Sequence, residues 1–159
     1  FGVAPAMLMF NTISWALTDT PGLRMLPYIT LMIAICGAIR LARFNVDTRQ
    51  ASEFIGLPIP ANAIFWIGAV SWLHNLELPG IMSVYLIPVI VCVSLMMVAP
   101  MHLFSLKFKN FSLRDNWYRF LLVITAVALV AIFGLEGLAL LIVFYIVLAY
   151  IVNVAVTHK

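Results

Sequence analysis

The sequence has 159 residues, of which 65% are hydrophobic and 9% are charged, with a formal net charge of +3. Soluble domains carry about 25% charged residues, so this composition excludes an ordinary soluble domain. The apolar runs are long and do not alternate with polar residues, which indicates an integral membrane protein of the helical kind. No nucleic-acid partner is expected.

Six apolar segments follow one another along the chain. A helix that crosses a hydrocarbon core needs about 20 mostly apolar residues, and Gly and Pro turn signals mark four of the five breaks between the segments. The sequence therefore predicts an all-α fold, a polytopic transmembrane helical bundle of about six spans that forms a single domain over residues 1–159. The predicted spans are roughly 1–17, 28–43, 60–76, 82–105, 119–135 and 137–157.

The basic residues are distributed unequally between the two ends of these predicted spans. Threading six spans puts loops 44–59 and 106–118, together with both chain ends, on one side, and eight of the nine Lys and Arg residues fall there. Only Arg24 falls on the other side. Because basic residues favour the cytoplasmic side of a membrane, the sequence predicts that this basic side faces the cytoplasm.

Arg40 and Arg43 end an apolar run that carries no charged residue from Met25 to Ile39. An arginine at the bilayer centre costs about 2.5–3.5 kcal/mol, so the pair is expected where a helix meets water or a polar cavity. Residues three apart share a helix face, and two guanidiniums on one face suit a phosphate or a carboxylate. The alternative is that both arginines only anchor the helix at the membrane surface.

Three elements of the predicted cytoplasmic side are candidates for substrate binding. Asn45 follows the arginine pair, and the segment 54–60 leads back into the membrane, although it is also explained as a simple turn. Alternating Lys and Phe in 106–111 would place Lys107 and Lys109 on one side of an extended segment, with general attraction to anionic lipids as the alternative. The candidate substrate-binding residues are Arg40, Arg43, Asn45, Lys107 and Lys109.

Several kinds of catalytic site have no signature in the sequence. It contains no Gly-rich phosphate loop, no pair of His or Cys residues at metal-binding spacing, and no nucleophile elbow. No acidic residue lies deep in a predicted span, which disfavours an ion-coupled pump. A non-enzymatic transporter or scaffold remains an alternative, although only a few polar side chains fall within the spans.

Four sequence segments resemble one enzyme family, in order and over most of the chain. They are Phe1-Gly-Val-Ala-Pro-Ala6, Arg40-Leu-Ala-Arg-Phe-Asn45, Phe54-Ile-Gly-Leu-Pro-Ile-Pro-Ala61 and Leu106-Lys-Phe-Lys-Asn-Phe111. These segments are similar to those of the bacterial and archaeal CDP-diacylglycerol–serine O-phosphatidyltransferases, in the CDP-alcohol phosphotransferase family. The aspartate signature that defines this family, D-G-x2-A-R-x8-G-x3-D-x3-D, is absent and is expected upstream of Phe1. We therefore expect the chain to be the C-terminal part of such an enzyme.

The resemblance implies an activity, substrates and a cofactor. The implied reaction transfers a phosphatidyl group from CDP-diacylglycerol to L-serine, giving phosphatidylserine and CMP, at a bacterial or archaeal cytoplasmic membrane. It implies a divalent metal, Mg²⁺ or Mn²⁺, bound mainly by aspartates missing from this chain, so no catalytic or metal-binding residue is expected in it and the fragment alone should be inactive. A homodimer among membrane lipids is also implied. The alternative within the family is a sister enzyme that uses glycerol phosphate or inositol phosphate.

Overall fold

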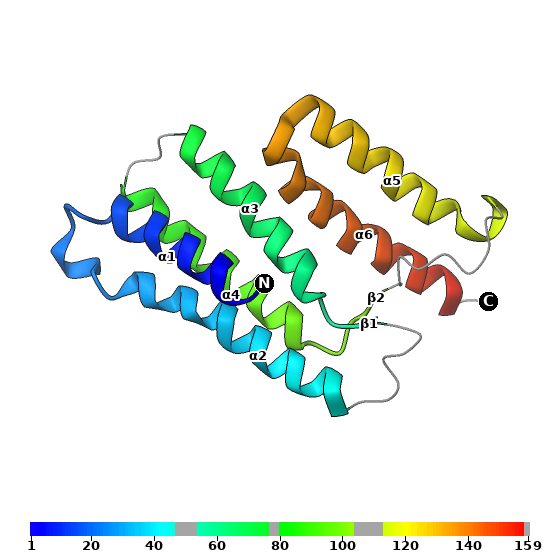
Figure 1. The fold of residues 1–159 in the computed structure, drawn as a ribbon, viewed down its shortest axis with the longest axis horizontal. Coiled ribbons are helices and arrows are strands. Elements are labelled where there is room, and N and C mark those ends of the chain that lie inside the picture. The colour runs from blue at the N-terminus through cyan, green and yellow to red at the C-terminus, as the bar shows by residue number, and fades with distance from the viewer. Residues whose placement is uncertain (47–53, 77–79, 104–112, 158–159) are drawn as a thin grey trace.

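The structure, a computed structural model, describes residues 1–46, 54–76, 80–103 and 113–157. Within them the chain forms six α-helices, each of which overlaps one predicted apolar segment, so the all-α prediction is confirmed. Successive helices run in opposite directions (Figure 1). The helices are α1 (Val3–Ala16), α2 (Leu31–Val46), α3 (Ile59–Asn75), α4 (Leu86–Val98), α5 (Leu113–Phe133) and α6 (Gly137–Thr157).

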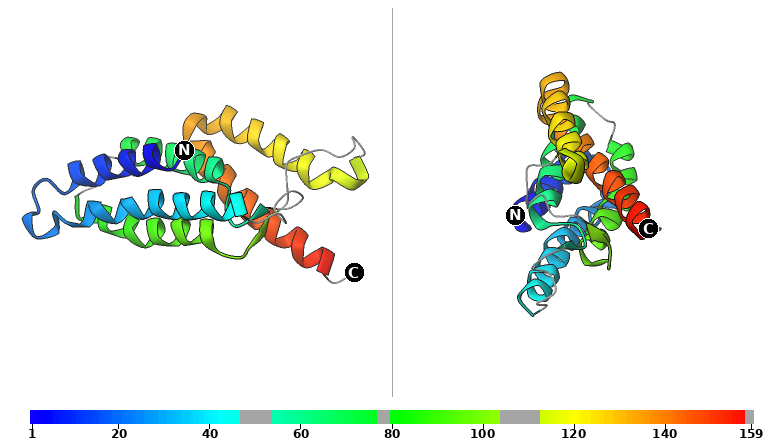
Figure 2. Two further views of the ribbon diagram at one scale, coloured as in Figure 1. Left: turned by 60° about the horizontal axis from the view of Figure 1, so that its bottom comes forward. Right: turned by 90° about the vertical axis from the view of Figure 1, so that its right-hand side faces the viewer.

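Short elements connect these helices. The 3₁₀ turns η1 (Pro21–Leu23) and η2 (Leu26–Thr30) join α1 to α2, η4 (Gly80–Tyr85) leads into α4, and η5 (Gly134–Glu136) joins α5 to α6. Two strands of two residues each, β1 (Phe54–Ile55) and β2 (His102–Leu103), pair antiparallel with Phe54 opposite Leu103. The strands lie at one end of the helices, and the connection between α1 and α2 lies at the other (Figures 1 and 2).

The prediction of about six membrane spans is not supported by the helix lengths. In the part of the chain that the structure describes, two stretches are long and apolar enough to cross a membrane, Pro21–Val46 and Asn116–Asn153. The helices α1, α3 and α4 have only 14, 17 and 13 residues. A helix needs about 20 residues to cross a hydrocarbon core. The second stretch contains most of α5 and of α6, which fold back on each other at η5 (Figure 1).

The centre of the bundle lies around α3, which packs against α1 and α6, while α2 packs against α1 and α4. Gly68 allows the close contact between α3 and α6, because a Cβ there would lie 2.4 Å from the backbone nitrogen of Ala139. The outermost helix is α5, which packs on α6 (Figure 1). Side chains with at most 1% exposure mark the core, among them Met9, Ile13, Ile33, Trp66, Ile90 and Met97.

Large apolar side chains cover the outer face of α5. Ile124 and Val127 are each 66% exposed, and Ile132 is 72% exposed. A contiguous apolar surface of this kind marks contact with a membrane or with another protein. Together with the two long apolar stretches, it supports an association of the chain with a membrane.

Candidate substrate-binding site at the end of helix α4

The C-terminal end of α4 is the point at which the segments singled out in the sequence meet. An α-helix leaves its last four carbonyl groups without a partner inside the helix. In α4, the carbonyl of Leu95 accepts a hydrogen bond from the backbone N–H of Ala99 at 2.9 Å, and that of Met96 accepts one from Leu57 N–H at 3.0 Å. Two carbonyls then require donors from elsewhere.

Arginines of α2 supply those two donors. Nη1 of Arg40 donates to the carbonyl of Met97 at 3.1 Å, and Nη1 of Arg43 donates to the carbonyl of Val98 at 2.8 Å. Positive charge at this position also complements the negative end of the helix dipole. The prediction that both arginines point the same way is confirmed, and the partners that the structure gives them here are backbone carbonyls of α4.

Arg40 is buried, with 5% of its surface exposed. Its Nη1 also donates to the carbonyl of Ile55 in β1 at 2.7 Å, and Tyr145, a buried residue of α6, lies near it. Simple anchoring at the membrane surface therefore does not describe Arg40, because its guanidinium is held by the protein. These two bonds leave further donors, since a guanidinium carries five N–H groups.

Gly56 forms the turn that brings β1 against α4. Its φ is +77°, a left-handed conformation that glycine adopts without steric cost. A Cβ at this position would lie 2.5 Å from the carbonyl oxygen of Met97 and 2.8 Å from Nη1 of Arg40. The backbone N–H of Gly56 donates to the carbonyl of Met101 at 2.6 Å. The segment 54–60 is therefore more than a turn, because it closes over the end of α4 and over Arg40.

The exposed part of the site is at the end of α2. Arg43 and Asn45 are both exposed there, so an anionic group can approach them from outside the protein. The other two predicted binding residues, Lys107 and Lys109, lie outside the described residues. The structure therefore brings the arginine segment and the glycine turn together, and leaves the predicted role of each candidate residue as a prediction.

The described residues do not offer a metal site. No group of three or more His, Cys, Asp or Glu side chains within them is placed to hold a metal ion.

A buried polar pair that sequence reasoning missed lies one turn into α3, where Trp66 Nε1 donates to Asn62 Oδ1 at 3.0 Å. Asn62 is fully buried. Tyr145 was also missed, because a tyrosine in an apolar helix carries no local signal of the contact it makes.

Comparisons with known proteins identify relatives along most of the chain, although no family model matches it. The CDP-diacylglycerol–serine O-phosphatidyltransferase of Helicobacter pylori (strain ATCC 700392 / 26695) is 30% identical over 153 residues, which is 92% of this chain and 60% of that protein. The protein of the same name from Methanocaldococcus jannaschii is 33% identical over 84 residues, 53% of this chain and 37% of that protein.

A third relative has a different name. The archaetidylserine synthase of Methanothermobacter thermautotrophicus is 42% identical over 64 residues, 40% of this chain and 25% of that protein. The chain spans about three fifths of the length of its Helicobacter relative. The resemblance that the sequence motifs indicated is thereby confirmed, and the chain is a relative of the CDP-diacylglycerol–serine O-phosphatidyltransferases.

Proposed function

We propose that the protein containing this chain transfers a phosphatidyl group from CDP-diacylglycerol to L-serine, giving phosphatidylserine and CMP. The observation that carries the proposal is the meeting of two distant segments, around Arg40 and around Gly56, at the end of α4. Both belong to a chain that matches, over 92% of its length, a relative named for this activity. The substrates CDP-diacylglycerol and serine follow from that name.

Arg43 and Asn45 are the residues of this chain that we propose to contact a substrate. Both are exposed, and Arg43 uses one bond to hold Val98. Its other N–H groups can form the paired hydrogen bonds that arginine makes with a carboxylate or a phosphate. The serine carboxylate and the lipid-linked phosphate are the two candidate partners. Arg40 would hold the end of α4 in place and present its remaining donors to the same group.

The reaction requires positively charged groups in the site. The serine hydroxyl attacks the phosphorus bonded to diacylglycerol, the bond to the CMP oxygen breaks, and the serine proton leaves to a base. Cationic groups stabilise the charge that develops on the phosphoryl oxygens. Lys107 and Lys109 are proposed to hold the phosphates of CDP-diacylglycerol. As the family resemblance implies, a divalent ion, Mg²⁺ or Mn²⁺, would be bound mainly by residues outside this chain, and no step is assigned to it.

The proposed setting is a cytoplasmic membrane, with Arg43 at the cytoplasmic face and all six helices embedded as one domain. The alternating helix directions and the apolar outer face of α5 support this arrangement. The shortest helix, α4, has 13 residues but continues directly from the six residues of η4. A homodimer within the lipid bilayer is part of the proposal.

The test is release of CMP from CDP-diacylglycerol by the protein as its gene encodes it, purified in detergent with Mg²⁺ or Mn²⁺. Serine should support turnover, whereas glycerol phosphate and inositol phosphate should not. Turnover with one of those two acceptors and none with serine would assign the protein to a sister enzyme. No CMP release with any acceptor would favour a transporter or scaffold.

A further inference from the structure

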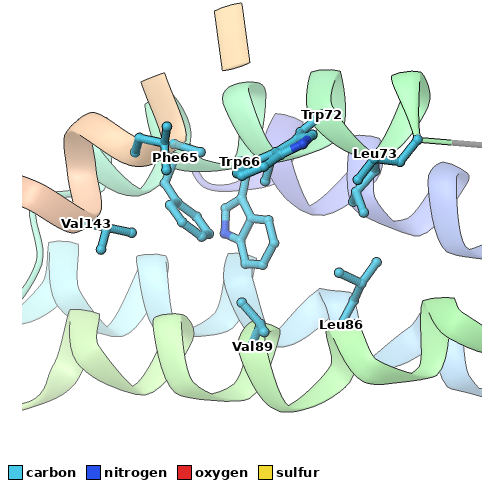
Figure 3. A pocket seen from close by; sticks show the side chains of 11 residues that line it. Phe65, Trp66, Trp72, Leu73, Leu86, Val89 and Val143 are labelled. Carbon is cyan, nitrogen blue, oxygen red and sulfur yellow. The ribbon is translucent and has the colours of Figure 1, made fainter. Parts of the chain in front are cut away.

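An apolar groove lies between α3, α4 and α6, away from the arginines. Its volume is about 330 Å³, and all of its lining side chains are apolar or aromatic. Figure 3 shows the Trp66 side chain projecting from α3 toward Val89 of α4, with Phe65 and Val143 beside it. The groove opens to the surface, because Leu76, Val89 and Val143 in its lining are 52%, 39% and 48% exposed.

The length of the groove matches one leaflet of a bilayer. Its wall on the α3 side extends from Phe65 to Leu76, the residue that follows the helix, which is about 16 Å at the rise of an α-helix. Half of a hydrocarbon core about 30 Å thick is about 15 Å. Its wall on α6 includes Val143 and belongs to Asn116–Asn153, one of the two stretches that are long and apolar enough to span a membrane.

A polar pair marks the outer end of the groove. Asn75, next to Leu76 at the end of α3, donates a hydrogen bond from Nδ2 to Oε1 of Glu136 in η5. Both residues are at the end of the bundle opposite β1 and the arginines, since α3 runs from that site toward Asn75. The groove thus begins near polar side chains at one surface and ends at the buried ring of Trp66, which is 1% exposed.

We propose that this groove holds one acyl chain of a membrane phospholipid from the leaflet opposite the arginine site. The apolar lining suits a hydrocarbon chain, the length suits one leaflet, and the Asn75–Glu136 pair lies at the level expected for that lipid's headgroup. The proposal rests on the membrane setting of the proposed function but not on its chemistry. It adds a lipid site distinct from the one that would hold the substrate headgroup.

Photo-crosslinking tests the proposal. The protein as its gene encodes it is placed in vesicles of phosphatidylethanolamine and phosphatidylglycerol, with a trace of phosphatidylethanolamine that carries a diazirine in its acyl chain. Cross-linked peptides are then identified by mass spectrometry. We expect cross-links on α3 and α4 within the groove, and a reduction of about fivefold or more in Ala69→Phe, because the larger ring fills the groove from α3.

Matched variants keep the result interpretable. Ala128→Phe makes the same change on the exposed face of α5 and should leave cross-linking in the groove unchanged. Val89→Phe fills the groove from α4 and should reduce cross-linking as Ala69→Phe does. If one of the two variants fails to fold, the other still tests the proposal. The measurement needs no turnover, and a protein that releases no CMP can still give the cross-links.

Three outcomes would overturn the proposal. Cross-links on α3 and α4 that both filling variants leave unchanged would mean that the acyl chain reaches these helices from outside the groove. Cross-linking by a diazirine analogue of CDP-diacylglycerol but not by phosphatidylethanolamine would mean that the groove serves the substrate. Cross-links between the groove and a second copy of the chain, without lipid, would mean that it is a subunit interface.

Discussion

Arg40 and Met97 are 57 positions apart in the sequence, yet the Arg40 guanidinium donates a hydrogen bond to the Met97 carbonyl at 3.1 Å. The same nitrogen also holds the carbonyl of Ile55 at 2.7 Å. Arg40 therefore joins α2, β1 and the end of α4 at one buried point. Arg43, one turn later, holds the next carbonyl of α4 while remaining exposed. The two arginines thus differ in exposure although they share a helix face.

Replacing Arg40 should destabilise the fold. Arg40→Met leaves the carbonyls of Ile55 and Met97 without this donor, and an unsatisfied buried polar group costs about 1–3 kcal/mol. We expect the thermal unfolding midpoint in detergent micelles to fall clearly. Arg24→Met, at an exposed position at the other end of the bundle, is the control and should leave the midpoint near that of the wild type. Equal midpoints for the two variants would contradict a structural role for Arg40.

Alanine substitutions at Gly56 and Gly134 distinguish two ways in which a side chain can destabilise a turn: backbone strain and a steric clash. Both have positive φ, +77° and +60°, and a left-handed conformation costs a residue with a Cβ about 1–2 kcal/mol. A Cβ at Gly56 would also lie 2.5 Å from the backbone oxygen of Met97. A Cβ at Gly134 would have no neighbouring atom within 4 Å.

Gly56→Ala should therefore lower the free energy of unfolding by more than Gly134→Ala. Reversible unfolding in mixed detergent micelles measures both variants. The excess in Gly56→Ala reports the close approach of the turn to α4. A larger loss in Gly134→Ala would show that the turn at Gly56 is not packed as the structure describes.

The positions of the helices were largely predictable from the sequence, because long apolar runs bounded by Gly and Pro leave few alternatives. The predicted span 137–157 coincides with α6, Gly137–Thr157. The predicted span 82–105 extended too far, since α4 ends at Val98. Ala99 is extended, with ψ of 147°, as the residue before Pro100 favours.

The partners of the candidate residues were not predictable in the same way. Helical spacing predicts that Arg40 and Arg43 share a face, but it does not reveal which element that face meets. The capping of α4 by α2 depends on how helices distant in sequence pack, and the positive φ of Gly56 serves a contact with Met97. Such contacts are properties of the tertiary structure and have no local pattern.

Chemical labelling tests the proposed orientation. In a background with Cys36→Ala and Cys92→Ala, single cysteines are introduced at the exposed positions Asp19 and Val46. In intact cells, a membrane-impermeant maleimide should label Asp19→Cys, whereas Val46→Cys should react only after the membrane is permeabilised. The reverse pattern would place the arginine end outside the cytoplasm. Labelling of both in intact cells would contradict a membrane crossing between them.

Lys107 and Lys109 lie outside the described residues, and kinetics can test their predicted role. If they hold the phosphates of CDP-diacylglycerol, Lys107→Ala and Lys109→Ala should each raise the KM for that substrate and leave the KM for serine nearly unchanged. Mixed-micelle assays with varied surface concentration of CDP-diacylglycerol measure both constants. An unchanged KM for the lipid substrate in both variants would favour general attraction to anionic lipids.

The most direct test of the proposed site is the steady-state kinetics of Arg43→Lys in the protein as its gene encodes it. Lysine keeps the charge but loses the planar pair of donors, and a hydrogen bond to a charged group contributes about 1.5–3 kcal/mol, or about tenfold or more in affinity. We predict a rise of about that size in the KM for serine or for CDP-diacylglycerol, whichever substrate carries the anionic group at Arg43, with little change in the thermal midpoint. Wild-type values of both KM constants and of kcat would contradict a substrate-binding role for Arg43.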